Sequence, residues 1–143
     1  MYYNKVDLCG INTARLPVLK EAEKTRLLGI IRAGGEAACA AREEMISGNL
    51  RLVLSVVQKC SGRYGSRGHG ENMDDLFQVG CIGLIKAIDN FDTTQGVRFS
   101  TYGVPMIVGE IRRFLRDDTP MRVSRAGRDL AYRAMQAREE LQK

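Results

Sequence analysis

Between residues 73 and 116 the chain reads MDDLFQVGCIGLIKAIDNFDTTQGVRFSTYGVPMIVGEIRRFLR. Apolar residues recur at three- and four-residue intervals on both sides of the polar segment at residues 93–96, which is the pattern of two amphipathic helices joined by a turn. The helices differ in charge: residues 74–95 hold four acidic residues and one lysine, whereas residues 96–143 hold ten basic and six acidic residues. We therefore expect the two helices to face partners of different chemistry.

The first helix is predicted over residues 75–92, with Asp74 as its N-cap. One face is apolar and rich in small residues, so it should form the core and admit a neighbouring helix closely. The opposite face mixes large apolar side chains with acidic and amide groups, as protein-binding hot spots do. The alternative is that another part of the chain covers this face. The core face contains Leu76, Phe77, Gly80, Gly83, Leu84, Ala87, Ile88 and Phe91, and the outer face contains Asp75, Gln78, Val79, Ile82, Ile85, Lys86 and Asp89.

The second helix has an arginine-rich face opposite an apolar face. Arginine binds phosphate through paired hydrogen bonds and stacks on bases, and Phe99 and Tyr102 add rings on which a base can lie. Single-stranded DNA suits this surface; the alternative is an ordinary solvated basic face with both rings in the core. The outer face contains Arg98, Tyr102, Pro105, Met106, Gly109, Arg112, Arg113 and Arg116, and the apolar face contains Val104, Ile107, Val108, Ile111, Phe114 and Leu115.

Helical patterns also cover residues 18–32, 36–46, 49–60 and 121–142, with Ser124 as the N-cap of the last. Residues 1–17 have no helical period and are interpreted as an extended arm, and the glycine-rich residues 61–72 as a surface connection. No strand-like alternation with turn spacing appears. The fold class is therefore all-α, with an arm over residues 1–17, a helical domain over residues 18–117 and the start of a further helical unit over residues 118–143.

The composition permits a nucleic-acid partner, and the sequence shows no recognisable catalytic or metal-binding set. With 143 residues, 44% hydrophobic, the chain can bury a core, and its net charge of +5 permits a nucleic-acid partner. Four widely spaced cysteines and one histidine suggest neither a zinc site nor a disulfide framework. No nucleophile with its base is recognisable, so we expect no catalysis and no cofactor. No apolar run approaches the roughly 20 residues that span a bilayer, so we expect a cytoplasmic protein with no membrane partner.

Four motifs occur in the order and near the spacing that mark the sigma-70 family of bacterial sigma factors. They are NLRLV at residues 49–53, DDLFQVGCIGL at 74–84, FSTY at 99–102 and GEIRR at 109–113. The resemblance covers about residues 18–143 and corresponds to the end of region 1, all of region 2 and the start of region 3. Residues 4–20, 104–113 and 122–125 look most like the sporulation sigma factors of the forespore, the late sigma-G type first and the early sigma-F type second.

The resemblance implies a compact helical bundle that binds core RNA polymerase through the clamp coiled coil of its largest subunit. It also implies that the chain directs polymerase to sporulation promoters by recognising and melting the minus-ten element as unpaired non-template DNA, and that an anti-sigma protein masks the same surfaces. The positions that match the family's polymerase-binding motif are Asp75, Gln78, Val79, Cys81 and Ile85. By the same resemblance, Arg98, Phe99, Thr101 and Tyr102 form the pocket for a flipped base, and Asn49 and Leu52 hold a second base. Duplex DNA is contacted by Arg112, Arg113 and Arg116, and an extended minus-ten element by Arg122, Arg125 and Asp129.

Two departures from the family pattern alter these expectations. Pro105 and Met106 stand where housekeeping members carry two tryptophans, so we expect weaker intrinsic melting. The chain stops at Lys143 without the helix-turn-helix that reads the minus-thirty-five element, so we expect a fragment of a longer factor. A truncated helical adaptor that binds polymerase without recognising promoters is the alternative function.

Overall fold

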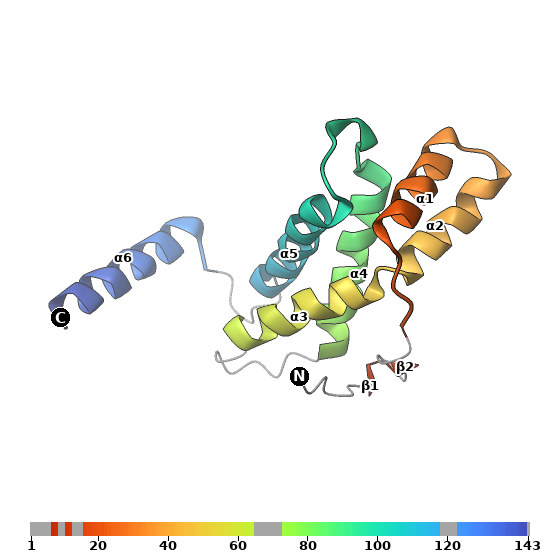
Figure 1. Cartoon of the computed structure of the whole chain (residues 1–143). Helices are drawn as coiled ribbons and strands as arrows, with labels where there is room; N and C mark the ends of the chain where they lie inside the picture. Colours follow the sequence, from red (N-terminus) through yellow and green to blue (C-terminus); the bar gives the residue numbers. More distant parts are fainter. Residues whose placement is uncertain (1–6, 9–10, 13–15, 65–72, 118–122, 143) are drawn as a thin grey trace.

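The computed structural model of the protein describes residues 7–8, 11–12, 16–64, 73–117 and 123–142 (Figure 1). Its helices are α1 (Glu21–Ala33), α2 (Glu36–Ser47), α3 (Leu50–Tyr64), α4 (Met73–Asn90), α5 (Phe99–Asp117) and α6 (Arg125–Leu141), with a 3-10 turn, η3 (Thr93–Gln95). The all-α prediction is confirmed. Two short strands, β1 (Asp7–Leu8) and β2 (Ile11–Asn12), pair antiparallel within the predicted arm. Each strand has only two residues, which is too short to show an alternation of apolar and polar residues in the sequence.

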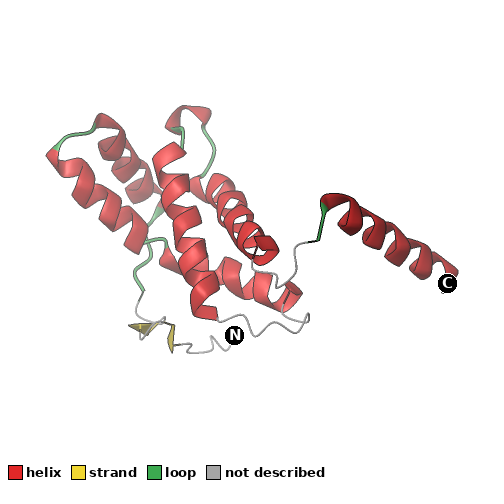
Figure 2. Cartoon of the chain, turned by 180° about the vertical axis from the view of Figure 1, so that it is seen from behind, coloured by secondary structure: helices red, strands yellow, loops and turns green. Residues whose placement is uncertain are grey.

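Helix α4 lies at the centre of the bundle. Helices α3 and α5 pack against α4 and against each other, while α1 and α2 lie side by side as a hairpin whose second helix reaches α4 (Figure 1). The view from behind shows the same arrangement, with α6 standing apart from the bundle (Figure 2). The α1–α2 turn depends on Gly34 and Gly35, whose φ angles are 73° and 88°. Residues other than glycine rarely adopt this region of the backbone.

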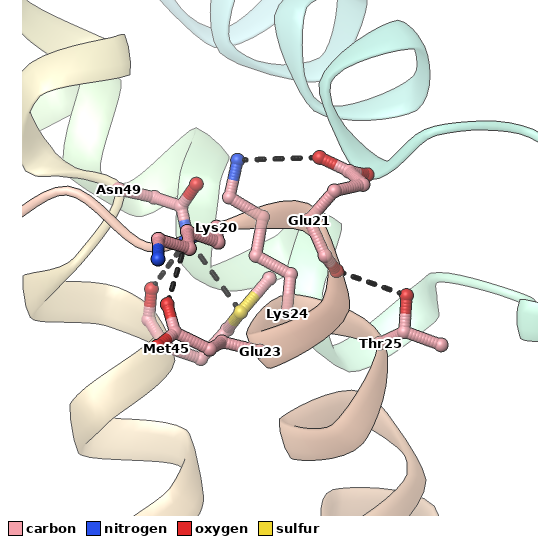
Figure 3. A network of polar contacts seen from close by, with 7 residues as sticks. All are labelled: Lys20, Glu21, Glu23, Lys24, Thr25, Met45 and Asn49. Atoms are coloured by element: carbon pink, nitrogen blue, oxygen red, sulfur yellow. Dashed lines mark hydrogen bonds and ion pairs between the residues drawn. The ribbon is translucent and has the colours of Figure 1, made fainter.

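Hydrogen bonds within the first turn of α1 stabilise the start of this helix, which lies beside the corner between α2 and α3 (Figure 3). The backbone N–H of Lys20 donates to the Glu23 carboxylate at 2.7 Å, and Thr25 Oγ1 donates to the Glu21 carbonyl at 3.1 Å. Because Lys20 is extended and acts as N-cap, the helix begins at Glu21, three residues later than predicted. Leu19 packs against Gly48, so a larger residue at that corner would have to displace the Leu19 side chain.

The predicted core face of α4 is confirmed, since all eight of its residues are buried. Gly83 allows the closest packing: a Cβ at this position would lie 2.7 Å from Ile107 Cα, so the backbones of α4 and α5 nearly touch. The predicted bounds of α3 and α4 were wrong. Helix α4 spans Met73–Asn90 instead of residues 75–92, which places Asp74 inside its first turn. Helix α3 continues to Tyr64, so only residues 65–72 of the predicted connection lie outside the described residues.

One ion pair ties α2 to α4 near the end of the bundle core. Arg42 donates from Nε and Nη2 to both carboxylate oxygens of Asp89, at 2.8 and 2.9 Å. The hydrogen bonds from Arg42 hold the pKa of Asp89 below its ordinary value of 3.8. Both side chains remain about 40% exposed, so water weakens the pair.

Asp89→Asn should therefore cost stability only where the carboxylate is ionised. A lowered folded-state pKa adds stability above the ordinary pKa, and that contribution is lost as the pH falls through the folded value. We expect a loss of at most about 1 kcal/mol at neutral pH that disappears as the pH falls below the lowered pKa of Asp89, measured by thermal unfolding between neutral and acidic pH. Glu43→Gln, at an exposed carboxylate inside α2, is the control. An equal, pH-independent loss for both variants would contradict the role of Arg42.

Helix α6 begins as predicted, because Ser124 Oγ accepts a hydrogen bond from the Gly127 N–H at 3.2 Å. Its large apolar side chains are exposed, with Leu130 at 70% and Met135 at 55%. The thin apolar stripe of this helix therefore has no cover from the described part of the chain. No helix among the described residues is long and apolar enough to cross a membrane.

Candidate protein and nucleic-acid interfaces

Helix α4 presents an open surface stripe, here called the α4 stripe, made of Asp75, Gln78, Ile82 and Ile85. Asp75 and Gln78 are exposed, Ile82 is 49% exposed, and Ile85 is half-buried. The alternative of a wholly internal helix does not hold for Ile82, which no described element covers. The other two predicted polymerase-binding residues, Val79 and Cys81, are half-buried and pack against the core. They therefore offer a partner less surface than the exposed residues of the α4 stripe do.

Helix α5 presents an arginine face, defined here as Arg98 and Pro105, Gly109, Arg112, Arg113 and Arg116, all of which are exposed. The opposite, apolar face is buried or half-buried as predicted. Tyr102 and Met106 are half-buried at the border between the two faces. Because Pro105 has no N–H, the Thr101 carbonyl lacks its helical donor, and Thr101 lies exposed beside the face. The predicted outer face is thus correct at its arginines.

Acidic neighbours set the position of two of these arginines. Glu110, whose side chain is only 16% exposed, binds Lys86 Nζ of α4 at 2.9 Å and Arg113 Nη1 at 3.4 Å. Arg116 pairs with Asp117 at 3.0 Å, and the hydrogen bond from Arg116 lowers the pKa of Asp117, which keeps that carboxylate ionised. The positive charges of Arg113 and Arg116 are therefore partly neutralised by Glu110 and Asp117.

A cavity of about 250 Å³ opens between the first turns of α1, η3 and the start of α5. Leu28, Phe91 and Phe99 line its apolar side, and Glu21, Lys24 and Arg98 are among its polar residues. Phe91 meets Phe99 edge-on, with ring centroids 5.4 Å apart, and meets Tyr102 at 5.7 Å. Aromatic walls with charged groups at the edge suit a flat, partly polar group such as a nucleobase.

The loop between α4 and α5 is held in place by an arginine that the sequence did not single out. Arg32 donates to the Phe91 carbonyl at 2.6 Å and lies 3.3 Å from Asp92. Asp92 in turn accepts hydrogen bonds from the N–H and Oγ1 of Thr94, and the backbone bond is the main reason why the pKa of Asp92 is lowered. Arg32 thus fixes the wall of the cavity, and no local motif marks it because its partners are distant in sequence.

Of the residues assigned to the flipped-base pocket, the structure brings Arg98 and Phe99 to the cavity. Phe99 is only 2% exposed, so its ring is part of the core and forms a wall of the cavity. Thr101 and Tyr102 do not line the cavity, although Tyr102 packs on its Phe91 wall. Glu21, Lys24 and Thr25 of α1 line it and were not predicted.

The remaining assigned DNA residues are dispersed. Asn49 is 2% exposed and its Nδ2 donates to the Met45 carbonyl at 2.8 Å, so in this structure it stabilises the α2–α3 corner (Figure 3). Leu52 is half-buried. Arg125 and Asp129 are exposed on α6, and Arg122 lies outside the described residues.

Comparison with known proteins identifies the bundle. Residues 45–120, which include α3, α4 and α5, match the family model for sigma-70 region 2. The RNA polymerase sigma-G factors of Clostridium acetobutylicum and Bacillus subtilis are 61% and 56% identical over 99% of this chain, and the RNA polymerase sigma-F factor of Bacillus subtilis is 48% identical over 87%. The chain spans about half of these relatives, 51% of each sigma-G factor and 46% of the sigma-F factor. The chain therefore belongs to the sigma-70 family of RNA polymerase sigma factors.

Proposed function

We propose that this chain binds core RNA polymerase and directs it to sporulation promoters by capturing the minus-ten element as unpaired non-template DNA. The observation that carries the proposal is the cavity beside Arg98, because it adjoins the arginine face and is built from aromatic and charged residues. A separate surface, the α4 stripe, is left for the clamp coiled coil of polymerase. The protein acts as an initiation factor in the cytoplasm of the forespore, and polymerase carries out the chemistry.

The size of the cavity supports one base as its occupant. Its volume of about 250 Å³ lies below the roughly 300 to 1,000 Å³ of pockets for drug-sized ligands. Arg98 can stack on a base or bind the adjoining phosphate, and the Phe91 and Phe99 rings supply an apolar wall. The flipped base remains chemically unchanged, and its capture keeps the strands apart.

Energetics indicate that this chain needs polymerase to open a promoter. Extruding one base costs a few kcal/mol, and one stacked base returns about 1 to 3 kcal/mol. Capture of a single base therefore roughly balances its own cost and leaves little to melt further pairs. Pro105 is exposed and Met106 half-buried, so neither supplies the flat wedge of the housekeeping tryptophans.

Tyr102→Ala is expected to weaken binding of a single-stranded minus-ten oligonucleotide by less than the roughly 1 to 3 kcal/mol of one stacked base, because Tyr102 packs on the Phe91 wall and does not itself line the cavity. Tyr102 is half-buried against Phe91, so its removal also loosens the aromatic wall of the cavity. Fluorescence anisotropy measures the affinity, and Tyr132→Ala, at an exposed tyrosine of α6, is the matched control. Equal affinities for both variants and the unchanged protein would remove Tyr102 from the site.

The function itself is tested with the same assay. The unchanged protein should bind the minus-ten oligonucleotide more tightly than a scrambled oligonucleotide of equal composition. Equal binding of the two would sink promoter recognition and favour an adaptor that only binds polymerase. Because the α4 stripe and the arginine face are exposed, an anti-sigma protein could silence the factor by covering either, and we expect such a partner.

A further inference from the structure

Glu110 of α5 binds two cations through one carboxylate oxygen, and the two cations belong to different surfaces. Its Oε1 lies 2.9 Å from Nζ of Lys86 on α4 and 3.4 Å from Nη1 of Arg113 on the arginine face. The Glu110 side chain is only 16% exposed, whereas those of Lys86 and Arg113 are 43% and 61% exposed. Glu110 is therefore the shielded member of the group, and an outside partner can reach either cation.

Lys86 lies at the edge of the α4 stripe. It follows Ile85 directly and Ile82 by one helical turn, so a protein that covers both isoleucines also comes close to Lys86. The stripe carries the exposed carboxylate of Asp75, which favours a partner with basic groups. Such a partner repels the ammonium group of Lys86 and removes water from around it. Both effects strengthen the ion pair between Lys86 and Glu110.

Arg113 is the more weakly held partner of Glu110. Its contact is the longer of the two, and its side chain is mostly exposed, so water screens the pair. A phosphate group must still displace Glu110 before it can form its own paired contact with Arg113. A carboxylate that is drawn towards Lys86 withdraws from Arg113, which makes this displacement easier.

We propose that Glu110 couples the two interfaces, so that docking of polymerase on the α4 stripe releases Arg113 for DNA. Glu110 is a positioning residue, since it acts through Arg113 and touches neither partner. The inference rests on the proposed function, which assigns the α4 stripe to polymerase and the arginine face to promoter DNA. Coupling of this kind is reciprocal: DNA that engages Arg113 leaves Glu110 to Lys86 and favours docking by the same factor.

Substitutions that conserve side-chain shape test the coupling in the chain without polymerase. The assay is fluorescence anisotropy on a fork DNA that is duplex upstream and single-stranded at the minus-ten element. Glu110→Gln should raise the affinity by at most about fivefold, the value of one exposed ion pair. Lys86→Gln should lower the affinity, because Glu110 is then left to Arg113 alone. Thermal unfolding of each variant checks that the fold is retained.

The double variant distinguishes the coupling from a general effect of charge. Lys86→Gln removes a positive charge and Glu110→Gln a negative one, so opposite effects on DNA affinity would also arise at long range. If Lys86 acts through Glu110, Lys86→Gln should have little effect in the Glu110→Gln background. Effects of the two substitutions that simply add would contradict the proposal.

The complex of the chain with core RNA polymerase tests the direction of the coupling. Docking should already have released Arg113, so Glu110→Gln should raise the DNA affinity of the chain alone and leave that of the complex unchanged. Asp117→Asn is the matched control. Its carboxylate lies 3.0 Å from Arg116 and also interacts with the charge of Arg113, but all three residues belong to α5. Asp117→Asn should therefore raise the affinity in both states.

Two outcomes would overturn the inference in different ways. An equal gain from Glu110→Gln in both states would show that Glu110 restrains Arg113 without any link to α4, and the proposed function would stand. If Glu110→Gln, Asp117→Asn and Arg113→Gln all leave DNA binding unchanged, the arginine face does not bind DNA. The coupling and that part of the proposed function then fail together.

Discussion

Gly83→Ala is expected to destabilise the protein by about 2 kcal/mol, which corresponds to a fall in Tm of roughly 10 °C for a bundle of this size. The added Cβ would lie 2.7 Å from Ile107 Cα and 3.2 Å from the Met106 carbonyl oxygen. Both are backbone atoms, so no rotamer change can relieve the contact. Separation of α4 from α5 would loosen the packing of Leu84 and Ile107, which are fully buried. Overpacking of about 3 kcal/mol exceeds the roughly 1 kcal/mol that alanine returns as a better helix former.

Denaturant and thermal unfolding followed by circular dichroism measure this loss. Gly29→Ala is the matched control and should raise stability by up to about 1 kcal/mol, because its Cβ has open space. Gly80→Ala should fall between the two, since its Cβ would meet side-chain atoms of Val53 and not the backbone of a neighbouring helix. If Gly83→Ala matched the Gly29 control, α4 and α5 would not be in backbone contact.

The helical period alone gave the inner faces of α4 and α5. Hydrophobic side chains that recur every three to four residues must share a side, so Leu84 and Ile107 could be placed in the core before their contact was known. The small residues of α4 also predicted close helix packing. The period could not give the partner of Gly83, because a contact between two helices depends on their relative register as well as on their faces.

At Phe99 the motif and the helical spacing of apolar residues suggest different positions for the aromatic ring. Phe99, Gly103, Ile107 and Ile111 recur every four residues and are all buried, so their spacing agrees with the alternative that the ring of Phe99 lies in the core. The motif FSTY instead suggested a ring offered to a base. Both are partly correct, because the buried ring is also a wall of the cavity.

The other side of the cavity could not be predicted from local sequence. Glu21 and Lys24 look like ordinary charges at the start of a helix, and they reach the cavity only because α1 folds back beside η3. Arg32 and its partner Phe91 are 59 positions apart in the chain, and nothing in the neighbouring residues of either one indicates the other. A site assembled across such a separation is a property of the fold.

Ile82→Asp is expected to abolish most binding to core RNA polymerase, with a loss of at least about 2 kcal/mol, or roughly thirtyfold in Kd. Ile82 is 49% exposed at the centre of the α4 stripe, between Gln78 and Ile85. Covering the exposed half of an isoleucine gives about 1 kcal/mol, and an aspartate forced into the same contact adds its own desolvation cost. Gln78→Ala and Ile85→Ala should have smaller effects, because each removes only part of a contact.

The position of Ile82 makes this loss separable from misfolding and from DNA binding. Its side chain points away from the core that Leu84 and Ile88 form, so helicity and Tm should stay close to those of the unchanged protein. Val18→Asp places the same charge at an apolar side chain that is 64% exposed ahead of α1, and it should bind polymerase normally. Oligonucleotide affinity should hold in both variants, since the cavity and the arginine face are untouched. Undiminished polymerase binding by Ile82→Asp would show that polymerase docks on another surface, whatever the DNA result.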